Sequence, residues 1–150
     1  MIRAVIVDDE SYAREGLNLA IQKFCTEIEI VGLCKTPDEG ISCIKSHKPD
    51  LLFLDVEMPI ISGFDLLESL ENSPQVILIT GKPDYALKAF DYDVTDYLHK
   101  PITMARFDAS VKRAVAKYEQ MHQVNEDEEH IFVKSNLKKR KVILNDIKWI

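Results

Sequence analysis

The 150-residue sequence lacks the features that mark a membrane protein or a secreted protein. It contains no apolar run that approaches the ~20 residues needed by a membrane-spanning helix. The apolar segment at the N-terminus is interrupted by Asp8 and Asp9, which is too early for a secretory signal peptide. These absences predict a cytoplasmic protein without a membrane partner.

Cysteine is scarce, and the histidines are scattered. The three cysteines, Cys25, Cys34 and Cys43, are odd in number and have no CxxC spacing. They are expected to be reduced and mostly buried, which argues against a disulfide framework or a zinc site. The four histidines show no metal-ligand spacing either. A flavodoxin-like cofactor binder is disfavoured, because acids stand where a phosphate-binding Ser/Thr/Gly-rich loop would follow the first strand.

Composition and charge indicate a globular body with a different module at its end. The hydrophobic fraction is 46% and the charged fraction is 29%, values that fit a soluble globular protein. The length allows one ordinary domain and a fragment. Although the net charge is −6, residues 131–150 carry six Lys or Arg and a single acid. An acidic body followed by a basic segment suggests two modules with different partners.

Short apolar runs alternate with helical stripes up to about residue 120. The runs are typical of buried strands and lie at residues 1–7, 28–34, 51–55, 75–79 and 96–98. The stripes are typical of helices and lie at residues 10–24, 37–47, 63–70, 83–90 and 104–118. Because the connections are short, the pattern predicts an α/β fold. It would be a five-stranded parallel sheet with helices on both faces.

Helix starts are marked by residues that favour capping. Thr36, Pro37 and Glu39 predict a capping box at the start of one helix. Ser62 and Thr103 predict the N-caps of two others.

The residues after 120 predict a linker and a partial second domain. Residues 121–130 are polar and acidic and indicate a linker, with an extension of the last helix as the alternative for the first half. Residues 131–133 and 142–144 predict two strands around a basic segment. About 20 residues cannot bury a core of their own, so residues 131–150 are expected to be the truncated start of another domain.

Polar residues follow four of the five predicted strands. They are Asp8 and Asp9, Asp55, Thr80 and Lys100. Taken singly, each has an ordinary explanation as a cap, a turn residue, a strand residue or a solvated cation. However, the carboxyl ends of parallel strands share one edge of a sheet, where ligands bind in such folds. The conjunction therefore predicts a functional site.

The chemistry of that site follows from its charge. Three carboxylates on one edge repel one another and need a cation, and oxygen ligands with open positions suit Mg²⁺. Without the metal, the crowding should raise the pKa of at least one carboxyl. A carboxylate such as Asp55, held by Mg²⁺ beside Lys100 and the Thr80 hydroxyl, can attack a phosphoryl group and form an acyl phosphate.

Four motifs surround these residues, namely Val7-Asp8-Asp9-Glu10, Asp55-Val56-Glu57-Met58-Pro59 with Gly63, Thr80-Gly81, and Tyr97-Leu98-His99-Lys100-Pro101. Together they resemble the receiver domain of two-component response regulators, over residues 1 to about 120. The resemblance implies a flavodoxin-like receiver fold in which Asp55 accepts a phosphoryl group from a sensor histidine kinase. It also implies a self-phosphorylating switch rather than a turnover enzyme.

The resemblance also assigns roles to individual residues. Asp9 and Asp55 would bind Mg²⁺ directly together with the backbone carbonyl of Glu57, and Asp8 would act through water. Lys100 would pair with the phosphoryl group, and Lys100-Pro101 would be a cis peptide.

Further roles concern the phosphoryl oxygens and the switch. The backbone N–H groups of Val56 and Gly81 would bind phosphoryl oxygens, and glycine lets the backbone come close. The Thr80 hydroxyl would move to the phosphoryl group, with Tyr97 turning inward behind it. Phosphorylation would then change the face formed by the fourth helix, the fifth strand and the last helix, and promote a homodimer.

A narrower resemblance concerns the output. Residues 84–90, Asp84-Tyr85-Ala86-Leu87-Lys88-Ala89-Phe90, are similar to receivers attached to LytTR DNA-binding domains. Residues 130–135 and 142–150 look like the first strands of that domain. The resemblance implies DNA binding and transcription regulation by the full-length parent protein, and not by this fragment. The basic run 138–141 is interpreted as a solvated hairpin turn rather than a phosphate-contacting patch.

Two alternatives of other kinds stay open at this point. A stand-alone signalling receiver would act by protein contact alone. A phosphohydrolase with an Asp nucleophile and Mg²⁺ would use Asp55 with Glu57 as a second acid, but Asp8-Asp9 already supply the acidic pair. The sequence also offers no inserted cap segment to enclose a substrate.

Overall fold

The computed structural model describes residues 1–82 and 85–134, in which strands and helices alternate along the chain. The elements are β1 (Ile2–Val7), α1 (Ser11–Phe24), β2 (Ile28–Cys34), α2 (Pro37–His47), β3 (Leu51–Asp55), α3 (Gly63–Glu68), β4 (Gln75–Thr80), α4 (Tyr85–Ala89), the 3₁₀ turn η1 (Phe90–Tyr92), β5 (Asp96–His99) and α5 (Met104–Lys134). The predicted order of strands and helices is confirmed.

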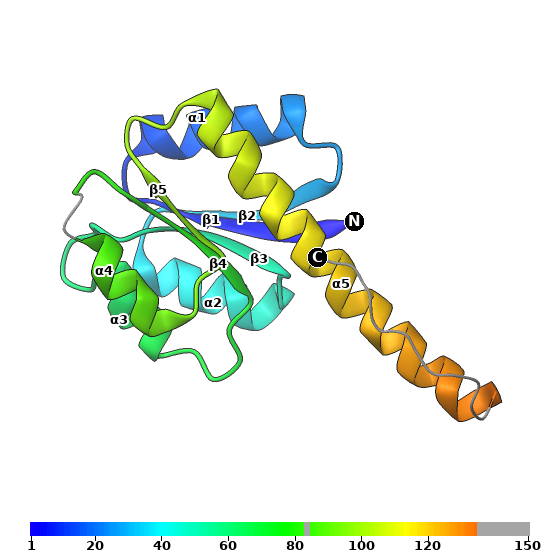
Figure 1. Ribbon diagram of the computed structural model, residues 1–150. Coiled ribbons are helices and arrows are strands. Elements are labelled where there is room, and N and C mark those ends of the chain that lie inside the picture. The colour runs from blue at the N-terminus through cyan, green and yellow to red at the C-terminus, as the bar shows by residue number, and fades with distance from the viewer. Residues whose placement is uncertain (83–84, 135–150) are drawn as a thin grey trace. The chain divides into compact units, whose positions relative to one another are not determined.

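The five strands form one parallel sheet in the order β2-β1-β3-β4-β5. Helix α1 and the first turns of α5 cover one face, while α2, α3 and α4 cover the other (Figure 1). The strand order reverses between β1 and β3, and in open α/β sheets such a switch point is where ligands bind. The predicted fold class, a five-stranded parallel sheet of flavodoxin-like topology with helices on both faces, is confirmed.

The sheet supplies most of the core because it is covered on both sides. All five residues of β3 are buried, as expected for a central parallel strand. Alternate residues of β1, β3 and β4 point toward α2, α3 and α4, where they pack around the buried ring of Phe64. The residues that these three strands contribute to the cluster are Val5, Val7, Leu52, Leu54, Val76 and Leu78.

Helix caps follow the sequence closely, with one difference. The Ser62 side chain accepts from the Asp65 N–H and the Asp65 carboxylate accepts from the Ser62 N–H, a complete capping box. Thr103 Oγ1 accepts from the Arg106 N–H at 3.2 Å. At α2, Thr36 accepts from Glu39 N, but the Glu39 carboxylate accepts from Lys35 N rather than Thr36 N. Only one of the two hydrogen bonds of the predicted capping box therefore forms. The Glu39 carboxylate accepts from the residue before the cap instead of from the cap itself.

The predicted apolar face of the fourth helix is wrong in detail. The sequence pattern places Ala86 and Leu87 on one apolar side of a helix, yet both are exposed, Leu87 to 79%, whereas Ala89 is buried. The described helix is only 5 residues long, which is too short for a full amphipathic stripe to form. Pro83 and Asp84, expected in this helix, lie outside the described residues.

Helix α5 extends through the predicted linker. It runs to Lys134, so residues 121–130 are helical and residues 131–133, expected to form a strand, continue the helix. Extending an existing helix adds one hydrogen bond per residue, whereas a strand needs a partner strand. The second predicted strand, at 142–144, lies outside the described residues, as do the basic run and residues 145–150.

Two compact units divide the chain, at residues 1–114 and 115–150. In the first unit, Phe107, Val111 and Ala114 of α5 are buried, as the stripe predicts, whereas Met104 is 52% exposed. In the second unit, the rings of Tyr118 and His122 lie 4.0 Å apart. The three cysteines are unpaired, and Cys25 and Cys34 are buried as expected. Among the described residues, no helix is long and apolar enough to cross a membrane.

The loop after β3 contains a strained residue. Ile60 has φ 71°, and its side chain is fully exposed. A left-handed backbone is unfavourable for a β-branched residue and costs about 1–3 kcal/mol. The Ile60 side chain makes no buried contact that could offset this cost.

Replacing Ile60 with a residue that tolerates positive φ should therefore stabilise the protein. We expect Ile60→Asn to raise the free energy of unfolding by about 1 kcal/mol, because Asn adopts this conformation more readily. Urea unfolding followed by circular dichroism measures the change. Ile60→Val keeps the β-branch and should leave stability nearly unchanged. A less stable Ile60→Asn variant would contradict the assignment of strain.

Candidate functional site

The ends of β1, β3, β4 and β5 meet at one edge of the sheet, here called the C-terminal rim. The strand register pairs Asp55 with Ile79, and Thr80 with His99. Backbone hydrogen bonds extend this pairing beyond the strands, since Lys100 N donates to Thr80 O at 2.8 Å and Asp8 N donates to Cys34 O at 3.0 Å. The rim therefore brings together all five polar residues that the sequence singled out.

Three of these residues form an acidic cluster. One carboxylate oxygen from each of Asp8, Asp9 and Asp55 lies within 4.8 Å of the others. Asp8 and Asp55 are each 2% exposed, and Asp9 is the more exposed member. Asp8 Oδ1 accepts from the Glu10 N–H at 2.9 Å, and Asp55 Oδ1 accepts from the Glu57 N–H at 3.1 Å. Backbone donors thus orient the two buried carboxylates.

Lys100 supplies positive charge to this cluster. Its Nζ lies 3.4 Å from Asp8 Oδ2, 3.9 Å from Asp55 Oδ2 and 3.1 Å from Glu10 Oε1. The Lys100–Pro101 peptide is cis, as the resemblance implies. The contact with Glu10 was not anticipated from the sequence, where Glu10 appeared only as part of a motif. The acids near Lys100 raise its pKa against the opposing effect of burial.

The surroundings of Asp55 raise the pKa of its carboxyl well above the ordinary value. Burial, and after it the neighbouring Asp8 carboxylate, raise the pKa of the Asp55 carboxyl to about 8, against the opposing effects of Lys100 and the Glu57 N–H. A single lysine does not compensate three crowded carboxylates. The predicted rise of a carboxyl pKa at this edge is therefore found at Asp55.

The side chain of Glu57 reaches across the rim to the end of β4, a contact that the sequence motifs do not predict. Glu57 Oε1 accepts from the Thr80 hydroxyl at 2.9 Å and from the Gly81 N–H at 2.7 Å. Glu57 Oε2 lies 3.8 Å from Lys82 Nζ. The Gly81 hydrogen bond is the main reason that the Glu57 pKa is lowered. The sequence signal was available, since an acid two positions after a strand-end Asp can reach the end of the next strand.

Thr80 and Tyr97 are connected through Lys82. The Lys82 N–H donates to Thr80 Oγ1 at 3.0 Å, and the Tyr97 hydroxyl donates to the Lys82 carbonyl at 2.8 Å. Thr80 is fully buried, and Tyr97 is half-buried against the core cluster. A short hydrogen-bonded path therefore joins the rim to β5.

The structure corrects the prediction for Val56. Its N–H was expected to bind phosphoryl oxygens, but it donates to Ile79 O at 2.9 Å and so belongs to the sheet. The next N–H along the chain, that of Glu57, points at Asp55 instead. Gly63 packs against this segment, because a Cβ there would lie 2.7 Å from Asp55 O. A side chain at position 63 would push on the backbone that positions Asp55.

The donor set at the rim fits a hard divalent cation such as Mg²⁺. The three carboxylates converge, and the charge of the neighbouring Asp8 carboxylate adds to the effect of burial in raising the pKa of Asp55. Oxygen ligands of this kind are those that Mg²⁺ prefers. Cysteine and histidine ligands, which softer metals favour, are absent from this cluster.

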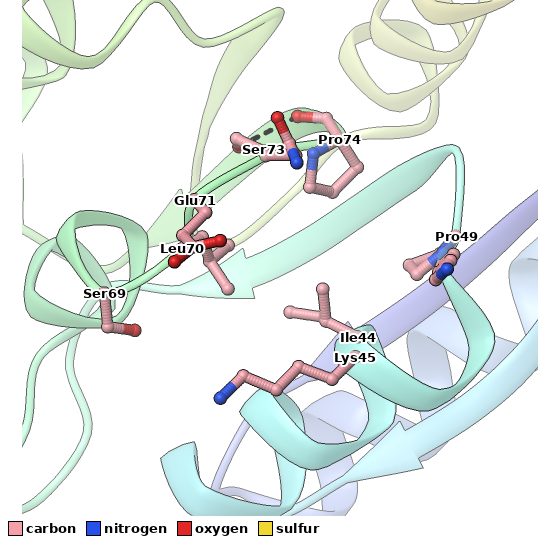
Figure 2. Close-up of a pocket in the computed structure, with 10 residues that line it drawn as sticks. Ile44, Lys45, Pro49, Ser69, Leu70, Glu71, Ser73 and Pro74 are labelled. Carbon is pink, nitrogen blue, oxygen red and sulfur yellow. Dashed lines mark hydrogen bonds between the residues drawn. The ribbon is translucent and has the colours of Figure 1, made fainter.

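A pocket of about 640 Å³ lies away from the rim. Figure 2 shows its wall, formed on one side by the end of α2 with Ile44 and Lys45 and on the other by the segment from Ser69 to Pro74. These segments precede β3 and β4, so the pocket lies at the opposite edge of the sheet. None of the clustered carboxylates lines it, and the site chemistry belongs to the rim.

Fold and site together define an α/β protein with an acidic cluster and a lysine at the strand ends. Residues 4–112 match the family described as "Response regulator receiver domain". The chain belongs to this family. The match ends close to Ala114, where the first compact unit ends.

Curated relatives extend beyond the present chain. The "Transcriptional regulatory protein BtsR" of Escherichia coli K12 is 44% identical over 115 residues, which are 75% of this chain and 48% of that protein. An "Uncharacterized response regulatory protein" of Vibrio cholerae is 38% identical over 120 residues, 79% of this chain and 50% of that protein. The chain thus spans about half the length of the curated relatives it matches.

Solved receiver structures share the fold. The REC domain of AraT, a response regulator from Geobacillus stearothermophilus, is 32% identical, with a TM-score of 0.69, over 81% of this chain and 98% of that one. The response regulatory domain of mrkE from Klebsiella pneumoniae is 26% identical, with a TM-score of 0.73, over 79% and 99%. The chain is accordingly a response regulator receiver.

The raised pKa of Asp55 should make the stability of the metal-free protein depend on pH. The ordinary pKa is 3.8 and the folded pKa is about 8, so between these values the folded protein holds a proton that the unfolded chain releases. This contribution is full below about pH 4 and is lost as pH rises toward about 8. Asp55→Asn should remove the loss and raise the free energy of unfolding at pH 8 by at least about 1.4 kcal/mol, the equivalent of one pKa unit.

Urea unfolding in EDTA at pH 5 and pH 8 measures this effect. Asp91→Asn removes an exposed carboxylate outside the acidic cluster and should keep the pH dependence of the wild type. Equal losses of stability in the wild type and in Asp55→Asn would show that Asp55 is not the group responsible.

Proposed function

We propose that this receiver is switched by phosphoryl transfer from a sensor histidine kinase to Asp55. The observation that carries the proposal is the buried, Lys100-paired Asp55 at the centre of the acidic cluster. In the transfer, the phosphorus–nitrogen bond of a phosphohistidine breaks and a bond from Asp55 Oδ to phosphorus forms. The imidazole nitrogen keeps the electron pair and takes a proton from solvent. The product is an acyl phosphate on Asp55.

Each residue of the rim has a role in this proposal. Asp9, Asp55 and the backbone carbonyl of Glu57 would hold Mg²⁺ directly, and Asp8 would hold it through water. The bound cation would supply charge neutralisation for the carboxylates and the phosphoryl oxygens. Lys100 pairs with the phosphoryl group and helps keep Asp55 ionised, which a nucleophile requires.

The oxyanion donors are assigned from the hydrogen bonds of the rim. The Thr80 hydroxyl and the Gly81 N–H would bind one phosphoryl oxygen. The Glu57 N–H, which already points at Asp55, is better placed for another than the Val56 N–H, which the sheet occupies. Preorganised donors of this kind stabilise the charge that develops during transfer.

The output of the switch is proposed from the relatives and the sequence. BtsR is called a transcriptional regulatory protein and is about twice as long as the matched region. This supports a parent protein in which a receiver at 1–120 and a connecting segment at 121–130 precede a LytTR-type DNA-binding domain beginning near 131. We expect DNA binding only from the full-length protein, in the cytoplasm. Most of residues 131–150 lies outside the described part of the chain.

Labelling with a small phosphodonor tests the proposal directly. Acetyl phosphate with Mg²⁺ should add one phosphoryl group to the wild type, seen by intact-protein mass spectrometry. Asp55→Asn should lose the label because the nucleophile is gone, and EDTA should suppress labelling of the wild type. Asp91→Asn is the matched control and should label normally. Equal labelling of Asp55→Asn and the wild type would refute the role of Asp55.

Sustained release of phosphate from phosphate esters would favour the phosphohydrolase alternative.

Phosphorylation should also promote dimers through the face of α4, β5 and α5. The reason is the path from Thr80 through Lys82 to Tyr97, which would carry a shift of the Thr80 hydroxyl to β5. Sedimentation velocity with beryllofluoride and Mg²⁺ should show a dimer at protein concentrations where the untreated protein is monomeric. Thr80→Ala breaks the path and should weaken the response. An unchanged sedimentation profile with beryllofluoride bound would count against the proposal.

A further inference from the structure

The Glu57 carboxylate occupies a ready-made anion site at the rim. This anion subsite consists of the Thr80 hydroxyl and the Gly81 N–H, both of which donate to Glu57 Oε1, at 2.9 and 2.7 Å. Lys82 Nζ adds a cation 3.8 Å from the second oxygen. Hydrogen bonds to an ionised acceptor are roughly twice as strong as neutral ones. The carboxylate is therefore held firmly rather than resting at random on the surface.

The same donors are needed by a phosphoryl group on Asp55. A backbone N–H is a single donor, and Gly81 cannot give its hydrogen to Glu57 and to a phosphoryl oxygen with full strength at once. The two acceptors are also close in the chain, since Glu57 follows Asp55 by two residues and its N–H donates to Asp55 Oδ1. Their negative charges would repel one another if both remained at the rim.

The subsite would be open to an outside anion if Glu57 left. A Cβ placed on Gly81 would meet Glu57 Oε1 at 3.4 Å, and no other described atom lies within 4 Å of it apart from those of its chain neighbours Thr80 and Lys82. Glu57 itself is only partly buried, with a side chain 32% exposed, so it has room to swing toward solvent. Lys82, with a side chain 63% exposed, can accompany the displaced carboxylate.

We infer that Glu57 is an internal competitor for the phosphoryl group and determines how readily the site accepts small anionic phosphodonors. The inference rests on the proposed function and deepens it. No covalent bond to Glu57 forms or breaks. Its hydrogen bonds to Thr80 and Gly81 are exchanged for those of a phosphoryl oxygen. A small donor has little binding energy with which to displace the carboxylate, whereas a protein donor gains energy over a larger surface.

Removing the charge at position 57 should therefore open the subsite. Gln in place of Glu57 keeps the side-chain length and the backbone carbonyl but makes a weaker, neutral acceptor. We expect Glu57→Gln to bind beryllofluoride with Mg²⁺ about tenfold more tightly and to label with acetyl phosphate about tenfold faster, the change expected when a charged hydrogen bond becomes neutral. Calorimetry measures the binding and mass spectrometry the labelling. Glu29→Gln removes the same charge at an exposed position near the opposite end of β2 and should change neither value more than twofold.

A second measurement separates this inference from phosphoryl transfer. In Asp55→Asn no acyl phosphate can form, yet inorganic phosphate can still compete for the subsite. The Gly81 amide signal in nitrogen–proton correlation spectra should move at about tenfold lower phosphate concentration in Asp55→Asn/Glu57→Gln than in Asp55→Asn. Equal phosphate dependence in the two variants, or weaker binding with Gln, would overturn the role of Glu57. Absence of labelling in the wild type, with the phosphate result as expected, would refute the proposed phosphoryl transfer and leave only the competition between Glu57 and free anions for the subsite.

Discussion

Lys100 lies within 3.9 Å of carboxylates that come from three different places in the chain. Asp8 follows β1, Asp55 ends β3, and Glu10 stands just before α1. These contacts exist because the strands are parallel and their register brings four carboxyl ends to one edge. The negative charge at this point is only partly neutralised, since one lysine lies beside three carboxylates. Burial raises the pKa of Asp55 and the neighbouring Asp8 carboxylate adds to the rise, so a further cation would favour the ionised form of this carboxyl.

A second charge arrangement lies beside the first and has opposite character. At Lys100 the acids outnumber the donors, whereas at Thr80 and Gly81 two donors and Lys82 converge on one carboxylate. The first arrangement attracts a cation and the second attracts an anion. A phosphoryl group on Asp55 would interact with both arrangements, because its oxygens can face a metal on one side and the hydrogen-bond donors on the other. Glu57 satisfies the second arrangement while no phosphoryl group is present.

Short-range patterns predicted most of the fold, and the failures share one cause. The strand at 51–55 and the caps at Ser62 and Thr103 depend on neighbouring residues, and they form as expected. The predicted apolar side of α4 and the predicted strand at 131–133 both depend on contacts that a local pattern does not contain. Leu87 is exposed because five residues offer too little helix to align a stripe, and residues 131–133 follow the helix already in progress. The intrinsic preference of residues for helix or strand does not determine the structure where tertiary packing, or the extension of an existing helix, contributes more free energy.

The composition of the site was readable from the residues, because strand ends in a parallel sheet must meet at one edge. Asp8, Asp9, Asp55, Thr80 and Lys100 could be grouped on that argument alone, together with the need for a cation. The hydrogen-bond partners could not be assigned in this way, since they depend on side-chain reach and on which backbone groups the sheet already uses. Only the folded chain decided that Val56 donates to Ile79, that Glu10 shares Lys100, and that Glu57 takes the donors at Thr80 and Gly81.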